Sequence, residues 1–251
     1  MNSLDLNCYD IDNVKLPFDS NWNSIAISVS GGADSALLTY LLCDTITNTN
    51  AQVSDIHIIN HVRMWKSRPW QQYYSERVYE WFVNRFKNLN FTRHVNFIAP
   101  DIEYGNIGPT ITDEYGKLKS GDNISQRAYA EFICHKEKCN AYYNAVTRNP
   151  RNISLGGMTE RDIEPDSSNE HLWLIKHMGG YGIHPFRFIE KSWVIKQYIR
   201  LNITELLDIT RSCEGEFTGL DYKTYTNGQY VPVCNTCFWC KEREWAIEQN
   251  K

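Results

Sequence analysis

Residues 30–35 have the sequence Ser-Gly-Gly-Ala-Asp-Ser, between the apolar runs Ile25–Val29 and Ala36–Leu42. This order predicts a buried strand, a tight glycine turn and a helix. Two adjacent glycines allow the backbone to adopt positive φ angles and to approach a ligand closely. The turn then presents N–H groups at the start of a helix, where the helix dipole favours negative charge. The stretch is therefore suited to binding phosphate.

The turn differs from the common phosphate loop, because no Gly-Lys-Ser/Thr sequence follows its glycines. No lysine lies within residues 30–35, so backbone N–H groups and the hydroxyls of Ser30 and Ser35 would hold the phosphate. An ordinary glycine turn that opens an α/β helix is the alternative interpretation of the same residues.

Strands and helices are expected to alternate along the rest of the chain. The predicted strands are 25–29, 56–59, 91–98 and 152–155, and the predicted helices are 35–44, 69–88, 124–139 and 190–201. This alternation predicts an α/β protein with a doubly wound parallel sheet. Ligands of such sheets bind at the carboxyl ends of the strands, where residues 30–35, Asn60 and Gly156 would converge.

Other stretches carry weaker signals. Residues 1–22 are polar and expected to be irregular, and residues 99–123 are expected to form a loop. The helix at 124–139 is expected to bury Ala128, Phe132 and Ile133.

Composition limits the class of protein. The chain has 251 residues, 42% of them hydrophobic, and a formal net charge of −4. An acidic balance disfavours a large nucleic-acid surface. No run approaches the roughly 18 apolar residues of a membrane span, and the acidic N-terminal stretch lacks a signal-peptide core. We expect a cytoplasmic protein with an N-terminal extension (1–22), a nucleotide domain (23–211) and a C-terminal tail (212–251).

The tail contains a cysteine motif. Cys234, Cys237 and Cys240 form a C-x-x-C-x-x-C run, and Cys213 offers a fourth thiolate 21 residues upstream. Four thiolates at this spacing suit a tetrahedral Zn²⁺ site. An iron–sulfur cluster also takes four cysteines, and ordinary thiols are the third interpretation.

Residues 30–35 resemble the pyrophosphate loop of the N-type ATP pyrophosphatases, which cleave ATP into AMP and pyrophosphate. With the other motifs, residues 24–247 resemble the 7-cyano-7-deazaguanine synthase family. These other motifs are Ser125-Gln126-Arg127, Gly156–Asp162 with Pro165-Asp166, His184-Pro185-Phe186 with Glu190-Lys191, and the cysteine tail through Arg243. The chain departs from the family pattern at Ala128, Glu164 and Ser167, and its spacing between Cys213 and Cys234 is longer.

The resemblance implies that ATP and Mg²⁺ activate 7-carboxy-7-deazaguanine as an acyl-adenylate. Ammonia then gives the amide, and a second activation gives the nitrile. It also implies a structural Zn²⁺ and a homodimer.

The resemblance also implies roles for individual residues. The expected nucleotide-binding residues are Ser28, Ser30, Gly31, Gly32, Ala33, Asp34, Ser35, Ala36, Asn60 and Gly156. The expected catalytic residues are Ser30, Asp34, Ser35, Arg127 and Lys191, and the expected substrate contacts are Arg127, Asp162 and Asp166. The alternatives are a helix-terminal carboxylate for Asp34, surface cations for Arg127 and Lys191, and a solvated loop for Asp162 and Asp166.

Three other functions fit the same sequence. An enzyme that stops at the amide, or conjugates the deazaguanine carboxylate to another amine, is motivated by Ala128, Glu164 and Ser167. A tRNA-thiolating relative would need a basic surface and a sulfur-handling cysteine or iron–sulfur cluster. A non-catalytic nucleotide-binding module is the third, and the intact loop at 30–35 argues against it.

Overall fold

The computed structural model describes residues 7–63, 68, 70–98, 111–112, 118–119, 121–150, 153, 155, 172–175, 180–214 and 232–251. The central strand–turn–helix unit agrees with the prediction. It consists of β3 (Ser24–Ser28), a turn and α1 (Ala33–Thr49). The helix is longer than the predicted 35–44.

A six-stranded sheet forms the centre of the molecule. Its spatial order is β5 (Asn90–Phe97), β4 (Asp55–Val62), β3, β8 (Ala141–Tyr143), β10 (Gly180–Ile183) and β9 (Leu172–Ile175). The first five strands run parallel, and β9 pairs antiparallel with β10 at one edge. The parallel strands carry their carboxyl ends to one edge, as predicted.

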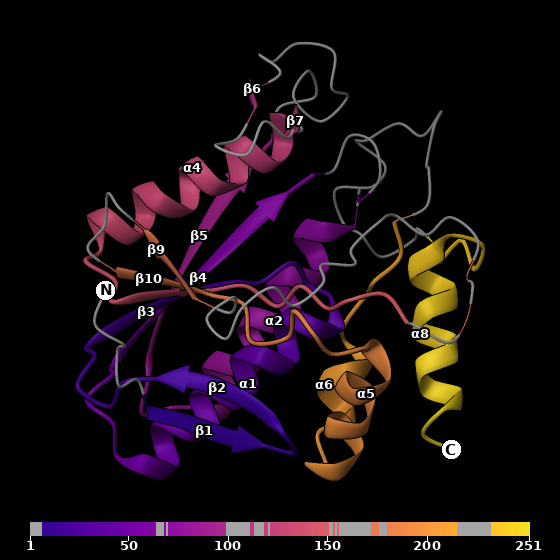
Figure 1. The fold of residues 1–251 in the computed structure, drawn as a ribbon, viewed down its shortest axis with the longest axis horizontal. Helices are drawn as coiled ribbons and strands as arrows, with labels where there is room; N and C mark the ends of the chain where they lie inside the picture. The colour runs from indigo at the N-terminus through magenta and orange to yellow at the C-terminus, as the bar shows by residue number, and fades with distance from the viewer. Residues whose placement is uncertain are drawn as a thin grey trace.

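Helices cover both faces of the sheet (Figure 1). Ile25 and Ile27 belong to the large core cluster that contains the buried residues of α1. Ala26, between them, belongs to a second cluster with Ala130 and Ile133 of α4 (Gly121–Lys136). Successive side chains of a strand point to opposite faces, so α1 and α4 lie on opposite sides. The prediction of a doubly wound α/β sheet is confirmed.

The face of α4 differs from the prediction. Ile133 is buried as expected, but Ala128 is exposed and Phe132 is 58% exposed. Ala130 and Cys134 are buried in place of these two residues. The prediction for Ala128 and Phe132 was wrong because the helix is rotated relative to the apolar stripe assumed for it.

The N-terminal stretch is also more ordered than predicted. β1 (Asn7–Ile11) and β2 (Val14–Phe18) form an antiparallel hairpin whose two-residue turn, Asp12-Asn13, has positive φ angles of 50° and 67°. Such turns match the twist of a hairpin and favour Asp and Asn. Leu16 and Phe18 are buried in the main core, so this hairpin is part of the folded body.

The remaining elements complete the layers. They are α2 (Gln71–Arg85), α5 (Lys191–Arg200), α6 (Thr204–Asp208), α8 (Phe238–Glu248) and the short pair β6 (Ile111–Thr112) and β7 (Leu118–Lys119), which lies inside the predicted loop 99–123. The strand predicted at 152–155 falls largely outside the described residues. Within the described part of the chain, no helix is long and apolar enough to cross a membrane.

The hairpin and the sheet are joined by a buried hydrogen bond. The hydroxyl of Tyr143 donates to the carbonyl oxygen of Pro17 at 2.8 Å, and the Tyr143 side chain is fully buried. We expect Tyr143→Phe to lower the free energy of unfolding by about 1–2 kcal/mol, because the Pro17 carbonyl loses a donor inside the protein. Urea unfolding measures this. Tyr73→Phe on α2, where the ring is half-buried, is the control, and an equal effect of both variants would contradict the prediction.

Candidate nucleotide site and metal centre

The turn after β3 depends on Gly31. Its φ angle is +81°, and a Cβ atom there would lie 2.8 Å from the backbone nitrogen of Ser75 in α2. Only glycine fits both the conformation and the close approach. Gly32, with an ordinary φ of −91°, is the residue immediately before α1. The turn that leads into α1 therefore packs closely against the backbone of α2.

The two serines of the turn are connected by hydrogen bonds. The backbone N–H of Ser30 donates to Ser35 Oγ at 3.2 Å, and the two Oγ atoms lie 3.3 Å apart. The N–H of Gly32 donates to Ser30 Oγ at 3.3 Å. These contacts fix the hydroxyls beside the helix terminus, where both can also face a bound anion.

A cavity of about 630 Å³ opens beside the turn. Ser28, Ser30, Gly32 and Ser35 line it on one side. Its cationic residues come from three parts of the chain: Arg63 and Arg68 from the connection between β4 and α2, Lys191 from α5, and Arg211. Its acidic residues are Asp34, Glu214 and Glu242. A cavity of this size with convergent polar groups is typical of a small-molecule site.

Lys191 and Asp34 meet although 157 residues separate them. Lys191 is the first residue of α5, its side chain is 4% exposed, and its Nζ donates to Asp34 Oδ2. Asp34 Oδ1 is also buried and has no hydrogen-bond partner among the described residues. A carboxylate oxygen beside phosphate-binding groups is the kind of ligand that Mg²⁺ uses, so Asp34 fits a nucleotide-bound Mg²⁺.

Asn60 is hydrogen-bonded to the backbone directly before the turn. It is 1% exposed, its Nδ2 donates to the carbonyl oxygen of Val29 at 2.6 Å, and its Oδ1 accepts from Arg93 Nε at 2.5 Å. Ala33 and Ala36 are fully buried, and the Ala33 carbonyl accepts the Tyr198 hydroxyl at 2.7 Å. These three expected binding residues shape the turn rather than line the cavity.

Arg127 lies apart from the cavity. Its side chain is 61% exposed, and its Nε donates to Glu131 at 2.8 Å, one turn further along α4. The neighbouring Gln126 lines the cavity instead. The structure therefore does not bring Arg127 to the turn. The expected site residues Gly156, Asp162 and Asp166 lie outside the described residues.

Arg211 is a cavity residue that sequence reasoning missed. Its guanidinium lies 5.1 Å from the ring centroid of Trp70 and 5.7 Å from that of Tyr74. Its backbone N–H donates to the Gly31 carbonyl at 2.8 Å. Arg63 was missed as well, although it follows β4 directly and the carboxyl ends of strands were expected to converge. Arg211 follows no strand and belongs to no recognised motif, so the sequence carries no signal for it.

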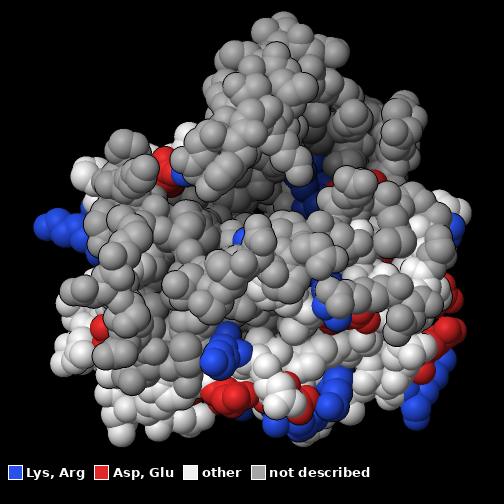
Figure 2. Space-filling view, in the orientation of Figure 1, with Lys and Arg blue, Asp and Glu red and all other residues white. Residues whose placement is uncertain are grey.

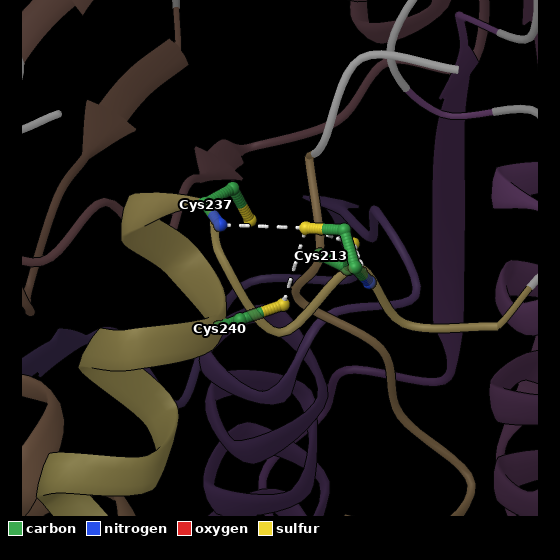
Figure 3. Close-up of side chains that lie close together, drawn as sticks. Cys213, Cys237 and Cys240 are labelled. Carbon is green, nitrogen blue, oxygen red and sulfur yellow. Dashed lines mark hydrogen bonds between the residues drawn. The ribbon is translucent and has the colours of Figure 1, made fainter.

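The four tail cysteines converge on one point. All four Sγ atoms lie within 4.8 Å of one another. Figure 3 shows the sulfur atoms of Cys237 and Cys240, at the start of α8, turned toward Cys213. The Cys213 and Cys234 sulfurs are 3.6 Å apart, and those of Cys234 and Cys240 are 3.9 Å apart. This cluster of thiols could hold a metal ion.

The surroundings of Cys234 favour its thiolate. Burial alone raises the pKa of this thiol, but hydrogen bonds from the backbone and side chains of Thr236 and Cys237 outweigh burial and lower the pKa to about 6. The Cys237 N–H lies 3.3 Å from Cys234 Sγ. A thiolate that accepts backbone N–H bonds is typical of metal-binding cysteine turns.

The cysteine cluster and the cavity are built from neighbouring residues. Cys213 is flanked by Ser212 and Glu214, and Cys240 is preceded by Trp239, and all three neighbours line the cavity. Elsewhere on the face shown in Figure 2, described Lys and Arg side chains are interspersed with Asp and Glu. Arg63, Arg68, Lys191 and Arg211 line the same cavity, and such a group of cations suits a small anionic ligand.

Comparisons with known proteins were made by sequence and by fold. No protein-family model matches the chain, and no curated protein matches it. Among solved structures, the chain is similar to the U34-tRNA thiolase NcsA from Methanococcus maripaludis with its 4Fe-4S cluster, at 13% identity and a TM-score of 0.45. This match covers 82% of the chain but 65% of the thiolase, just under two thirds of that protein. A second match is NAD⁺ synthetase from Burkholderia pseudomallei, with 11% identity, a TM-score of 0.38, and coverage of 91% and 80% of the two chains.

The two glycines of the turn should respond differently to substitution. We expect Gly31→Ala to lower the free energy of unfolding by about 1–3 kcal/mol, because it combines a positive φ with a backbone contact. Gly32→Ala is the matched control, since its φ is ordinary and its Cβ would meet Ser30 Oγ at 3.3 Å. Urea unfolding of both variants measures the difference, and equal stabilities would contradict the role assigned to Gly31.

The cysteine cluster should bind one metal ion or cluster per chain. We expect Cys234→Ser to remove most of the bound metal and to lower the melting temperature, because metal binding at such sites contributes folding free energy. Elemental analysis and thermal unfolding of purified protein measure both effects. Cys43→Ala, at a buried cysteine of α1, is the control. Full metal content in Cys234→Ser would contradict the assignment.

Proposed function

We propose that this protein is an ATP pyrophosphatase that activates a carboxylate as an acyl-adenylate and transfers it to a nitrogen nucleophile. The observation that carries the proposal is the turn at residues 30–35, which is fixed by its own hydrogen bonds and opens onto a cationic cavity. A carboxylate is a poor electrophile because attack adds negative charge to an anion. Adenylation provides AMP as a leaving group and removes this obstacle.

The residues of the turn would act on the departing pyrophosphate. The hydroxyls of Ser30 and Ser35 and the N–H groups at the start of α1 are fixed in advance, so they stabilise developing charge without rearranging. Asp34 would bind Mg²⁺, which neutralises phosphate oxygens when bound. Lys191 adds a buried cation beside the same loop, and the Arg211 guanidinium provides a further charge in the cavity.

The substrate we propose is 7-carboxy-7-deazaguanine, with ammonia as nucleophile and the nitrile as product. The motifs at residues 125–127, 156–166 and 184–191 support this choice through their resemblance to the synthase family. Cationic groups in the cavity suit a carboxylate substrate. The departures at Ala128, Glu164 and Ser167 keep the amide, or a conjugate with another amine, as the alternative product.

The metal we propose for the tail is Zn²⁺ in a structural role. Four thiolates without an open position form a closed tetrahedral site. A tRNA-thiolating enzyme is the second candidate function, and the observation in its favour is that the cysteine cluster borders the cavity. In that case the cysteines would hold an iron–sulfur cluster, which also takes four thiolates.

Incubation with ATP, Mg²⁺, ammonium and 7-carboxy-7-deazaguanine tests the function. We expect AMP and the nitrile, identified by product mass. Lys191→Met should slow AMP formation by about 100-fold, the scale of losing one stabilising group at a developing charge. Lys196→Met, on the same helix with a side chain 55% exposed, is the control.

Other outcomes separate the alternatives. The amide alone would identify an enzyme that stops early, and a conjugate would identify an amine ligase. No AMP above the substrate-free control would contradict this substrate. An iron-containing, coloured protein would favour thiolation.

A further inference from the structure

Glu242 is a buried carboxylate in the wall of the cavity that the expected chemistry does not use. Its side chain is 1% exposed, and its Oε2 lies 3.9 Å from Lys191 Nζ. The same Nζ donates to Asp34 Oδ2. Burying a lysine charge is unfavourable unless it is paired. The Lys191 ammonium is therefore shared by two carboxylates, one from the turn at residues 30–35, which we call the phosphate turn, and one from α8.

The tail places Glu242 at this point. Cys237 immediately precedes α8, Cys240 lies in its first turn, and Glu242 follows two residues later. Arg243 fixes the same turn by donating to the carbonyl oxygens of Thr210 and Leu207 at 3.1 and 2.9 Å. In addition, α8 packs along α5, the helix that begins with Lys191 (Figure 1). The cysteine cluster and this packing together decide where the carboxylate stands.

Glu214 is a second acidic residue of the tail that contacts cations of the cavity. It follows Cys213 directly, and it pairs with Arg68 and lies 3.9 Å from Arg63. Both acidic residues of the tail that line the cavity thus contact its basic residues. Of the two, Glu242 contacts the cation that also contacts the phosphate turn.

We propose that Glu242 is a positioning residue for Lys191. It holds the ammonium at the cavity wall beside the phosphate turn, so that Asp34 is not its sole counter-charge. Asp34 then keeps a carboxylate oxygen available for a cation, consistent with the buried Oδ1 that has no partner among the described residues. The proposal rests on the proposed function, because a nucleotide phosphate with its cation is the ligand that these groups would meet.

A glutamine at position 242 separates charge from packing. Glu242→Gln has almost the same size as the native side chain and can still hydrogen-bond, but it carries no charge. Among the described residues, Asp34 is then the carboxylate that still contacts Lys191, so the lysine side chain is held by one ion pair instead of two. Glu244→Gln is the matched control, because Glu244 lies on the same helix and is exposed.

The first experiment measures the reactivity of the Lys191 amine directly and needs no nucleotide. The full-length protein is labelled with acetic anhydride, and acetylation of each lysine is followed by mass spectrometry. We expect Glu242→Gln to speed acetylation of Lys191 by about tenfold, because an ammonium with one carboxylate contact fewer is held less tightly, and to leave Lys196 unchanged. Glu242→Asp should fall between the native protein and Glu242→Gln, and it replaces Glu242→Gln if that variant does not fold. Unchanged Lys191 labelling in the folded variant would overturn the proposal.

The second experiment is a double-mutant cycle on MgATP affinity, with Glu242→Gln and Lys191→Met combined. We expect Glu242→Gln to raise the Kd for MgATP by about tenfold in the native background and to have no further effect beside Lys191→Met. An additive loss in both backgrounds would show a merely structural role and overturn the proposal. If the native protein binds no MgATP, the proposed function fails, and the labelling result alone decides the role of Glu242.

Discussion

The buried ion pair between Asp34 and Lys191 is the contact on which the site depends. It joins the phosphate turn to α5 across 157 residues, and the Lys191 side chain is 4% exposed. Removing Lys191 would take this counter-charge from the Asp34 carboxylate, and loss of one partner from a buried pair costs about 3–5 kcal/mol. The pair therefore fixes the position of α5 relative to the turn, and α5 in turn supports α8 and the tail.

The tail contributes residues both to the cavity and to the cysteine cluster. Ser212, Glu214, Trp239 and Glu242 all line the cavity, and each lies within two residues of a cysteine of the cluster. A metal that holds the cysteines would thus restrict the same backbone segments that form the wall of the cavity. By linkage, a ligand that prefers the ordered wall would also favour the metal-bound form.

Much of the fold could be predicted because it is encoded locally. The strand–glycine turn–helix unit and the cysteine spacing are signals within a few residues, and both appear in the structure as expected. The hairpin was missed because its alternation is short, although the positive φ angles of Asp12-Asn13 are of the kind that this turn requires. Strand β8 was missed because three residues are too few to show a period. Phe132 is exposed because tertiary packing decides which face of α4 is buried. The spacing of apolar residues along the helix does not identify that face by itself.

The candidate site could be predicted only in part, for a related reason. Asp34 and Lys191 were identified from motifs, and the structure brings them together. Arg127 was also identified from a motif, but its guanidinium pairs with Glu131 on the solvent side of α4. Arg211 carries no motif, since its place above Trp70 depends on contacts between distant segments.

The charges of the cavity constrain what it can bind. Four basic residues line it, but three acidic residues line it too, and these three acids pair with three of the four cations. The excess positive charge of these side chains is small beside the several negative charges of a nucleotide triphosphate. The backbone N–H groups at the start of α1 supply part of the difference, because their partial charges are fixed and need no counter-ion. In the proposed function, a divalent cation on Asp34 would supply the rest, so such a site would suit a metal–nucleotide complex better than a free nucleotide.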